Sequence, residues 1–151
     1  MSEQEQRQRV VKALRRLDAF SVENHVGVGT PDVNYLHGWV ELKCLDKWPK
    51  RPGTPVKLHH DLTLEQRIWL KRRWAAGGEA YVILQVQKTQ DWLLFDGPTA
   101  ARLIGTATQG QLRDAALCTF TRIEEQLEPC LSQRANSRRG SASSSPGAAG
   151  D

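Results

Sequence analysis

The spacing of apolar side chains predicts a helix at the start of the chain, from about Glu3 to Leu17. Its apolar positions recur every three or four residues and form one stripe on a helix: Val10, Val11, Leu14 and Leu17. Glu3 belongs to the same stripe, because it stands seven residues before Val10. Residues 19–25 have strand character, since apolar and polar side chains alternate there.

Two short strands and a long irregular segment come next. A glycine-rich turn over residues 26–31 leads into strands at 32–36 and 39–44, which His37-Gly38 joins as a tight hairpin. Residues 45–61 contain three prolines and a glycine, which exclude long regular structure.

A second helix is predicted to begin after Thr63. The Thr63 side chain can cap the first turn while Gln66 reaches back, which makes a reciprocal capping box. Gly77 and Gly78 end this helix. Residues 80–86 are the most apolar strand and are expected in the centre of the sheet, and residues 92–95 form the next strand.

The last third of the chain is predicted to be helical and then disordered. Gly97-Pro98 introduces a short helix to about Ile104, and residues 109–126 have the pattern of a last amphipathic helix. After Pro129 the composition changes, and residues 132–151, rich in Ser, Ala, Gly and Arg, are expected to be disordered. The sequence thus predicts a domain over 1–128 and a tail over 129–151. Truncation after Gln133 is expected to leave thermal stability almost unchanged.

These elements predict one α/β domain with a mixed central sheet flanked by helices. A chain of 151 residues can bury one hydrophobic core. No apolar run approaches the ~20 residues of a membrane span, and the polar start does not resemble a signal peptide. No membrane partner and a cytoplasmic location are therefore expected. Three scattered cysteines, Cys44, Cys118 and Cys130, are expected to be reduced thiols rather than a disulfide framework.

Basic side chains are concentrated in the middle of the chain. The net charge of the whole chain is +4, whereas residues 47–73 alone carry +6. This concentration favours a surface that binds a polyanion such as DNA, although a solvated charged helix would give the same pattern. The candidate DNA-binding residues are Lys47, Lys50, Arg51, Lys57, Arg67, Lys71 and Arg72.

Candidate catalytic residues lie on the two short strands. Alternation puts Glu41 and Lys43 on one face of their strand, about 7 Å apart. Asp32 begins the preceding strand, so a hairpin would bring its carboxylate toward Glu41. Two convergent carboxylates and a backbone carbonyl make an oxygen-rich site of the kind that Mg²⁺ accepts. A lysine beside such a site can orient the attacking water.

Each of these features also has an ordinary structural explanation. A Glu-x-Lys pair on a half-exposed strand is often a surface salt bridge worth less than ~1 kcal/mol, and Pro-Asp is common in turns. Their combination on adjacent strands, after a glycine-rich turn, favours a nuclease site. His59-His60-Asp61 is only a weak signal of a metal site or an HNH-type nuclease, because adjacent side chains point to different sides of an extended chain.

These motifs resemble the PD-(D/E)xK nuclease superfamily, and most of all its compact VRR-NUC and Holliday-junction-resolvase-like members, which are common in phages and bacteria. The resemblance extends over about residues 3–86 and rests on three segments: Gly29-Thr30-Pro31-Asp32, Trp39-Val40-Glu41-Leu42-Lys43, and Gln66 with Leu70. It implies a restriction-endonuclease-like core with the element order αβββαβ, which the pattern of elements matches.

The resemblance also implies roles for individual residues. Asp32, Glu41 and the Leu42 carbonyl would hold Mg²⁺, for which Mn²⁺ is expected to substitute, and Lys43 would act at the water. Gln66 matches a family glutamine, while its place in the capping box offers a structural alternative. Many relatives add a glutamate from the first helix, for which Glu3 has the better face. Glu5 and Glu23 remain alternatives, so that the number of metal ions stays open.

The sequence therefore predicts a Mg²⁺-dependent DNA endonuclease that hydrolyses phosphodiester bonds, with branched or structured DNA as a candidate substrate. Its expected location is the cytoplasm, or the host cytoplasm if a phage encodes the chain. A homodimer is left open. The alternative hypotheses are a non-catalytic nucleic-acid-binding module and a protein-interaction domain of a phage or mobile element.

Overall fold

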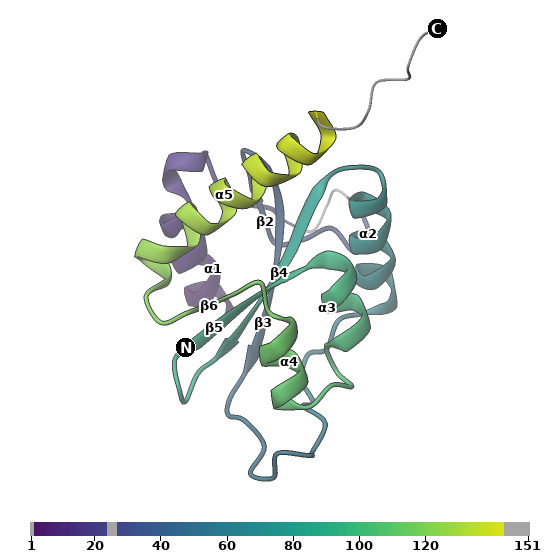
Figure 1. Cartoon of the computed structure of the whole chain (residues 1–151). Helices are drawn as coiled ribbons and strands as arrows, with labels where there is room; N and C mark the ends of the chain where they lie inside the picture. The colour runs from purple at the N-terminus through teal and green to yellow at the C-terminus, as the bar shows by residue number, and fades with distance from the viewer. Residues whose placement is uncertain (1, 24–26, 144–151) are drawn as a thin grey trace, which may run out of the picture.

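A computed structural model describes residues 2–23 and 27–143, which fold into three layers with helices on both faces of a mixed sheet (Figure 1). This confirms the predicted α/β class. The helices are α1 (Glu3–Ala13), the 3₁₀ helix η1 (Arg15–Leu17), α2 (Leu64–Ala75), α3 (Gly97–Leu103), α4 (Gln109–Ala115) and α5 (Ile123–Ser143). The strands are β1 (Phe20–Ser21), β2 (Val33–Tyr35), β3 (Gly38–Leu45), β4 (Glu79–Val86), β5 (Asp91–Asp96) and β6 (Cys118–Phe120).

The six strands lie side by side in chain order, from β1 at one edge to β6 at the other. All neighbours are antiparallel except β3 and β4, which are parallel because α2 carries the chain back across the sheet between them. The whole length of β3 pairs with β4, in register from Gly38 opposite Glu79 to Leu45 opposite Val86. These two strands form the centre of the sheet, as the apolar run at 80–86 predicts.

The alternation of side chains along the strands divides the core into two halves. On one face, Val40, Leu42 and Tyr81 pack with α1 and α5. On the other face, which α2, α3 and α4 cover (Figure 1), Val82 and Leu84 pack with side chains of these helices. Both faces of β4 are buried, so the run from Ala80 to Leu84 is apolar without alternation.

The first half of the chain follows the predicted elements with small shifts. The Thr63–Gln66 capping box begins α2, as predicted. The hairpin between β2 and β3 has the loop Leu36-His37 rather than His37-Gly38, because Tyr35 pairs with Gly38. The first strand is only two residues long, and the predicted range 19–25 reaches into residues 24–26, which lie outside the described part of the chain.

The predicted helix over residues 109–126 is wrong. Thr108 and Gln111 form a capping box that begins α4, but this helix ends at Ala115. Ala116 is extended, and the next residues form β6 on the edge of β5. Pairing with the sheet therefore overrides the local helical periodicity, and a new helix begins at Ile123.

The predicted boundary at residue 128 is also wrong, because α5 continues through Pro129 to Ser143. Four side chains at four-residue spacing are fully buried along this helix, and they are Ile123, Leu127, Leu131 and Ala135. Proline inside a helix costs ~3 kcal/mol through its missing N–H and its ring, and burial of this stripe offsets that cost. The domain thus extends at least to residue 143, and residues 144–151 lie outside the described part of the chain.

The same helix changes the expectation for the cysteines. The structure joins Cys118 of β6 to Cys130 of α5 in a disulfide, with the Cα atoms 7.5 Å apart, so the expectation of three separate thiols is wrong for this pair. The packing of α5 beside β6 brings these side chains together. Cys44 is a free thiol, as expected. Within residues 2–23 and 27–143, no helix has the length and apolar character needed to cross a membrane.

Candidate active site at the free edge of strand β3

The candidate site forms where β3 extends beyond its neighbour β2. The ladder with β2 ends at Val40, so the following residues of β3 lack a strand on that side. The Asp32 carboxylate fills part of the gap, since its Oδ2 accepts the Leu42 N–H at 2.9 Å. The Asp32 side chain therefore replaces a backbone partner at this edge. The Gln6 side chain, from α1, also reaches β3, where its Nε2 donates to the Lys43 carbonyl at 3.0 Å.

Glu41 is the central carboxylate of the site and is 3% exposed. Its Oε1 accepts a hydrogen bond from Gln66 Nε2 at 3.2 Å and lies 3.9 Å from Lys43 Nζ. Its Oε2 is buried and has no hydrogen-bond partner among the described residues. Lys43 also donates from Nζ to the Asp61 carbonyl at 3.4 Å. Glu41 and Lys43 thus converge on one face of β3, as alternation predicts.

Burial and the neighbouring Asp32 carboxylate hold the pKa of Glu41 well above its usual range. The positive charges of Lys43 and Arg7 lower the pKa of Glu41, but by less than burial and Asp32 raise it. Two carboxylates that approach each other in a buried place repel when both are ionised. A bound cation would relieve this repulsion, so the pair has the electrostatics of a cation site.

Arg7 and Gln6 complete the site from α1, and neither residue was among those predicted from the sequence. Arg7 Nη2 lies 3.4 Å from Asp32 Oδ1, and Arg7 Nε is buried with no partner among the described residues. Gln6 is 1% exposed, and its Oε1 accepts from the Cys44 thiol at 3.0 Å. Both residues stand one helical turn before Val10, on its face of α1, and that spacing was the signal available in the sequence.

Gln66 combines the two roles that the sequence left as alternatives. Its Oε1 accepts the Thr63 N–H at 2.9 Å in the capping box, and its Nε2 donates to Glu41. The N-terminus of α2 therefore positions this amide, and the amide orients the carboxylate.

The structure separates the three glutamates considered as further ligands. Exposed Glu3 lines a cavity of about 380 Å³ together with Lys43, His59 and His60. Glu5 is bound in the Ser2 capping box, whose hydrogen bonds lower its pKa. Glu23 is exposed and lines a different cavity, which it shares with Arg7. Glu3 is thus the one that shares a cavity with Lys43.

The candidate DNA-binding residues fall into two groups. Arg67 is occupied inside the fold, where its guanidinium donates to the carbonyls of Ala101 at 2.6 Å and Ile104 at 3.0 Å. Lys57 donates to the Gly105 carbonyl at 2.6 Å. These bonds hold the connection after α3. Arg67 is half-buried, whereas Lys57 is exposed, as are Lys47, Lys50, Arg51, Lys71 and Arg72.

In the parts of the chain that are described, no group of three or more His, Cys, Asp and Glu side chains could hold a metal ion. The site at β3 offers two carboxylates, from Asp32 and Glu41. Comparisons with protein-family models and with curated proteins find no match to this chain.

Proposed function

We propose that this protein hydrolyses phosphodiester bonds of DNA in a reaction that depends on a divalent cation. One observation carries the proposal: the buried Glu41 carboxylate lies beside Asp32, its Oε1 is 3.9 Å from Lys43 Nζ, and its Oε2 accepts no hydrogen bond from the described residues. A structural ion pair would satisfy both oxygens, because a buried polar atom without a partner is destabilising.

The donor set fits Mg²⁺ or Mn²⁺. Asp32 and Glu41 supply carboxylate oxygens, which are hard ligands. The N–H and C=O of one strand residue point to the same side, so the Leu42 carbonyl faces the Asp32 side as its N–H does. When bound, the cation would lower the pKa of a water molecule and offset charge on the reacting phosphate.

The protein side chains have separate tasks in this proposal. Lys43 holds the attacking water or a phosphate oxygen, and Gln66 fixes the orientation of Glu41. Arg7 orients Asp32 and keeps donors that can contact phosphate. The cavity next to Lys43 gives a DNA strand access to this edge. The observed order α1, β1, β2, β3, α2, β4 agrees with the αβββαβ order of the nucleases that the sequence resembles.

The deciding experiment is incubation of end-labelled DNA with the purified protein, in Mg²⁺ and in EDTA. Single-stranded, duplex, flap and four-way-junction substrates should be compared, because these geometries remain open. Cleavage in Mg²⁺ that is lost in EDTA and in Asp32→Ala is expected. Absence of cleavage on every substrate, in Mg²⁺ and in Mn²⁺, would contradict the proposal.

A non-catalytic DNA-binding module is the second candidate, and one contact favours it. Asp32 is already paired with Arg7 and with the Leu42 N–H, as a purely structural carboxylate would be. Such a module would bind DNA equally well in Mg²⁺ and in EDTA and would cleave none of the substrates.

Lys43 and the exposed basic residues are predicted to affect different steps. Lys43→Ala should lower the cleavage rate by roughly 10²-fold or more, the usual contribution of a positioned acid–base group, and should leave most of the DNA affinity. Lys50→Glu, Arg51→Glu or Arg72→Glu should weaken binding and lower the slope of log K against log salt by ~1 for each lost phosphate contact. Single-turnover cleavage and binding titrations at several salt concentrations measure both effects.

The matched control is Arg16→Glu, which reverses an exposed charge on η1 outside residues 47–73. It should change neither the rate nor the salt slope. Equal losses of affinity in Lys43→Ala and Lys50→Glu would mean that Lys43 is only another phosphate contact.

A further inference from the structure

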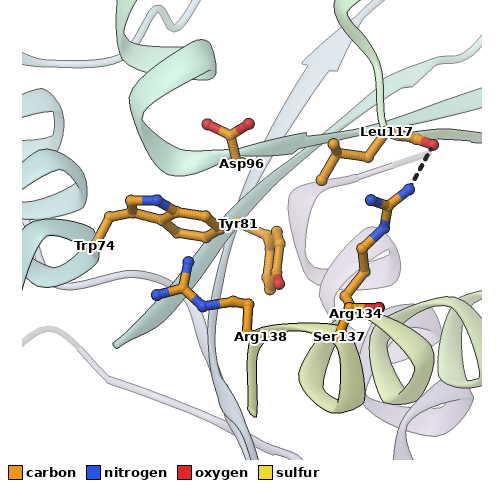
Figure 2. A pocket seen from close by; sticks show the side chains of 7 residues that line it. All are labelled: Trp74, Tyr81, Asp96, Leu117, Arg134, Ser137 and Arg138. Atoms are coloured by element: carbon orange, nitrogen blue, oxygen red, sulfur yellow. Dashed lines mark hydrogen bonds between the residues drawn. The ribbon is translucent and has the colours of Figure 1, made fainter. Parts of the chain in front are cut away.

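A second cavity lies on the opposite face of the sheet from Glu41. Its volume is about 400 Å³, and its lining comes from α2, the ends of β4 and β5, the segment before β6, and α5: Trp74, Tyr81, Asp96, Leu117, Arg134, Ser137 and Arg138 (Figure 2). On β4, Tyr81 immediately precedes Val82, which is the register partner of Glu41. Adjacent strand residues point to opposite faces, so this cavity is separate from the candidate active site.

Two arginines of α5 point toward this cavity from successive turns of the helix (Figure 2). The Arg138 guanidinium lies 3.8 Å from the centroid of the Trp74 ring and donates to the Gly78 carbonyl at 3.5 Å. Arg134 donates to the Leu117 carbonyl at 3.2 Å. Neither arginine forms an ion pair with any carboxylate of the described residues. Each guanidinium has five N–H donors, so both keep donors for an anion.

The other walls of the cavity are mainly aromatic and apolar. The rings of Trp74 and Tyr81 meet edge to face with centroids 5.6 Å apart. The Tyr81 hydroxyl is used inside the fold, because it donates to Glu79 at 2.9 Å. Tyr81 itself is only 1% exposed, so the wall open to a flat ligand is formed by the half-buried side chains of Trp74 and Leu117.

One carboxylate, that of Asp96, also lines the cavity, but it has partners of its own. Its Oδ1 accepts the Thr99 N–H at 2.8 Å, and its Oδ2 accepts the Thr99 hydroxyl at 2.9 Å. It caps α3, and the positive end of that helix offsets its charge. The uncompensated charge at the cavity is therefore that of the arginines.

We propose that this cavity binds a nucleoside monophosphate, with the phosphate between Arg134 and Arg138 and the base against Trp74 and Leu117. Guanidinium groups recognise phosphate oxygens through pairs of N–H donors. A volume of about 400 Å³ exceeds the space that an inorganic ion needs and lies in the range of small-molecule sites. The proposal does not depend on the nuclease function, because none of its residues belongs to the site at β3.

The test is calorimetric titration of the full-length protein with thymidine 5′-monophosphate, thymidine and inorganic phosphate, without a divalent cation. The nucleotide should bind at least about tenfold more tightly than either part alone, since each part makes only one set of contacts. Arg134→Gln and Arg138→Gln should each weaken nucleotide binding by roughly tenfold, as expected for loss of a charged hydrogen bond. A short 5′-phosphorylated oligonucleotide distinguishes a DNA end from a free nucleotide as the source of the phosphate.

Two further variants keep the test decisive if an arginine variant unfolds. Ser137→Phe places a ring at the cavity while both arginines remain, and it should abolish binding. Arg139→Gln removes the same charge from an exposed position of α5 and should leave affinity unchanged. Nucleotide affinity no greater than that of thymidine or phosphate, or unchanged in Ser137→Phe, would overturn the proposal.

Discussion

Glu41→Gln is expected to abolish DNA cleavage and, at the same time, to stabilise the protein in the absence of divalent cations. The loss of cleavage should reach about 10²–10³-fold or more, as for removal of one group that stabilises transition-state charge. The gain in stability follows from burial, because Glu41 is 3% exposed with an unpartnered Oε2. An uncharged amide of the same shape avoids the cost of placing this charge beside Asp32.

The gain in stability from Glu41→Gln should increase as the pH rises. Burial and Asp32 raise the pKa of Glu41 in the folded protein, so the folded state holds this proton more tightly than the unfolded chain does. Stability is then lost as the pH rises from the ordinary glutamate range toward the folded pKa. Glu41→Gln should therefore resemble the wild type at acid pH and exceed its melting temperature increasingly toward pH 8. A shift of about 2–4 °C is expected for each kcal/mol.

Added Mg²⁺ should raise the melting temperature of the wild type above that of Glu41→Gln. A cation that binds only the folded state stabilises it by ~2.7 kcal/mol at a concentration of 100 Kd. The wild type should gain this stability, and Glu41→Gln should gain much less. Melting curves at several pH values, with Mg²⁺ and with EDTA, measure each effect. Two results would contradict the cation site. One is a melting temperature of the wild type that does not change with Mg²⁺. The other is a Glu41→Gln protein that melts at a lower temperature than the wild type at pH 8 in EDTA.

Local sequence patterns predict the part of this site that lies on β3. Period-two alternation places Glu41 and Lys43 on one face, and a capping box fixes the beginning of α2 with Gln66 in it. Both patterns depend only on residues close together in the chain, so they hold in the folded structure. The contact between Gln66 and Glu41 also required the parallel pairing of β3 with β4, of which the sequence predicted only a mixed sheet.

The contributions of α1 could not be predicted in the same way. Whether Gln6 and Arg7 face the free edge of β3 depends on where β2 stops pairing, which is a property of the whole sheet. The contacts of Arg67 within the fold could not be predicted for a related reason. Its positive charge suggested a phosphate contact, but the carbonyls after α3 accept its donors inside the fold. Composition alone does not distinguish an exposed arginine from one that holds a loop.

The C-terminal helix is the largest difference between the predicted and the observed fold. Its composition, rich in Ser, Ala, Gly and Arg, is typical of disorder, and Pro129 argues against a helix. The buried stripe from Ile123 to Ala135 was present in the sequence at four-residue spacing. Only Ala135 of this stripe lies within the segment rich in Ser, Ala, Gly and Arg, so the spacing alone does not predict that the helix continues into that segment. Contacts with distant strands determine the fold here.

The structure therefore predicts that truncation after Glu128 strongly destabilises the protein, in contrast to the expectation of a domain that ends at residue 128. Truncation removes Leu131 and Ala135, which are fully buried against the face of the sheet that α1 also covers. It also removes the disulfide partner Cys130 and the arginine that lies over Trp74. The chain ending at Ser143 keeps the whole of α5 and is the reference for this comparison.

A point variant separates the packing of α5 from the length of the chain. Leu131→Ala should cost about 2–5 kcal/mol, the usual effect of truncating a buried leucine, and thus lower the melting temperature by roughly 5–15 °C. Gln133→Ala, two residues away at an exposed position, should change stability by no more than about 0.5 kcal/mol. Thermal melts of both variants under reducing conditions exclude any contribution from the disulfide. If Leu131→Ala melted within a degree of Gln133→Ala, α5 would not be part of the cooperative core, and the boundary of the domain would return to the region near residue 128.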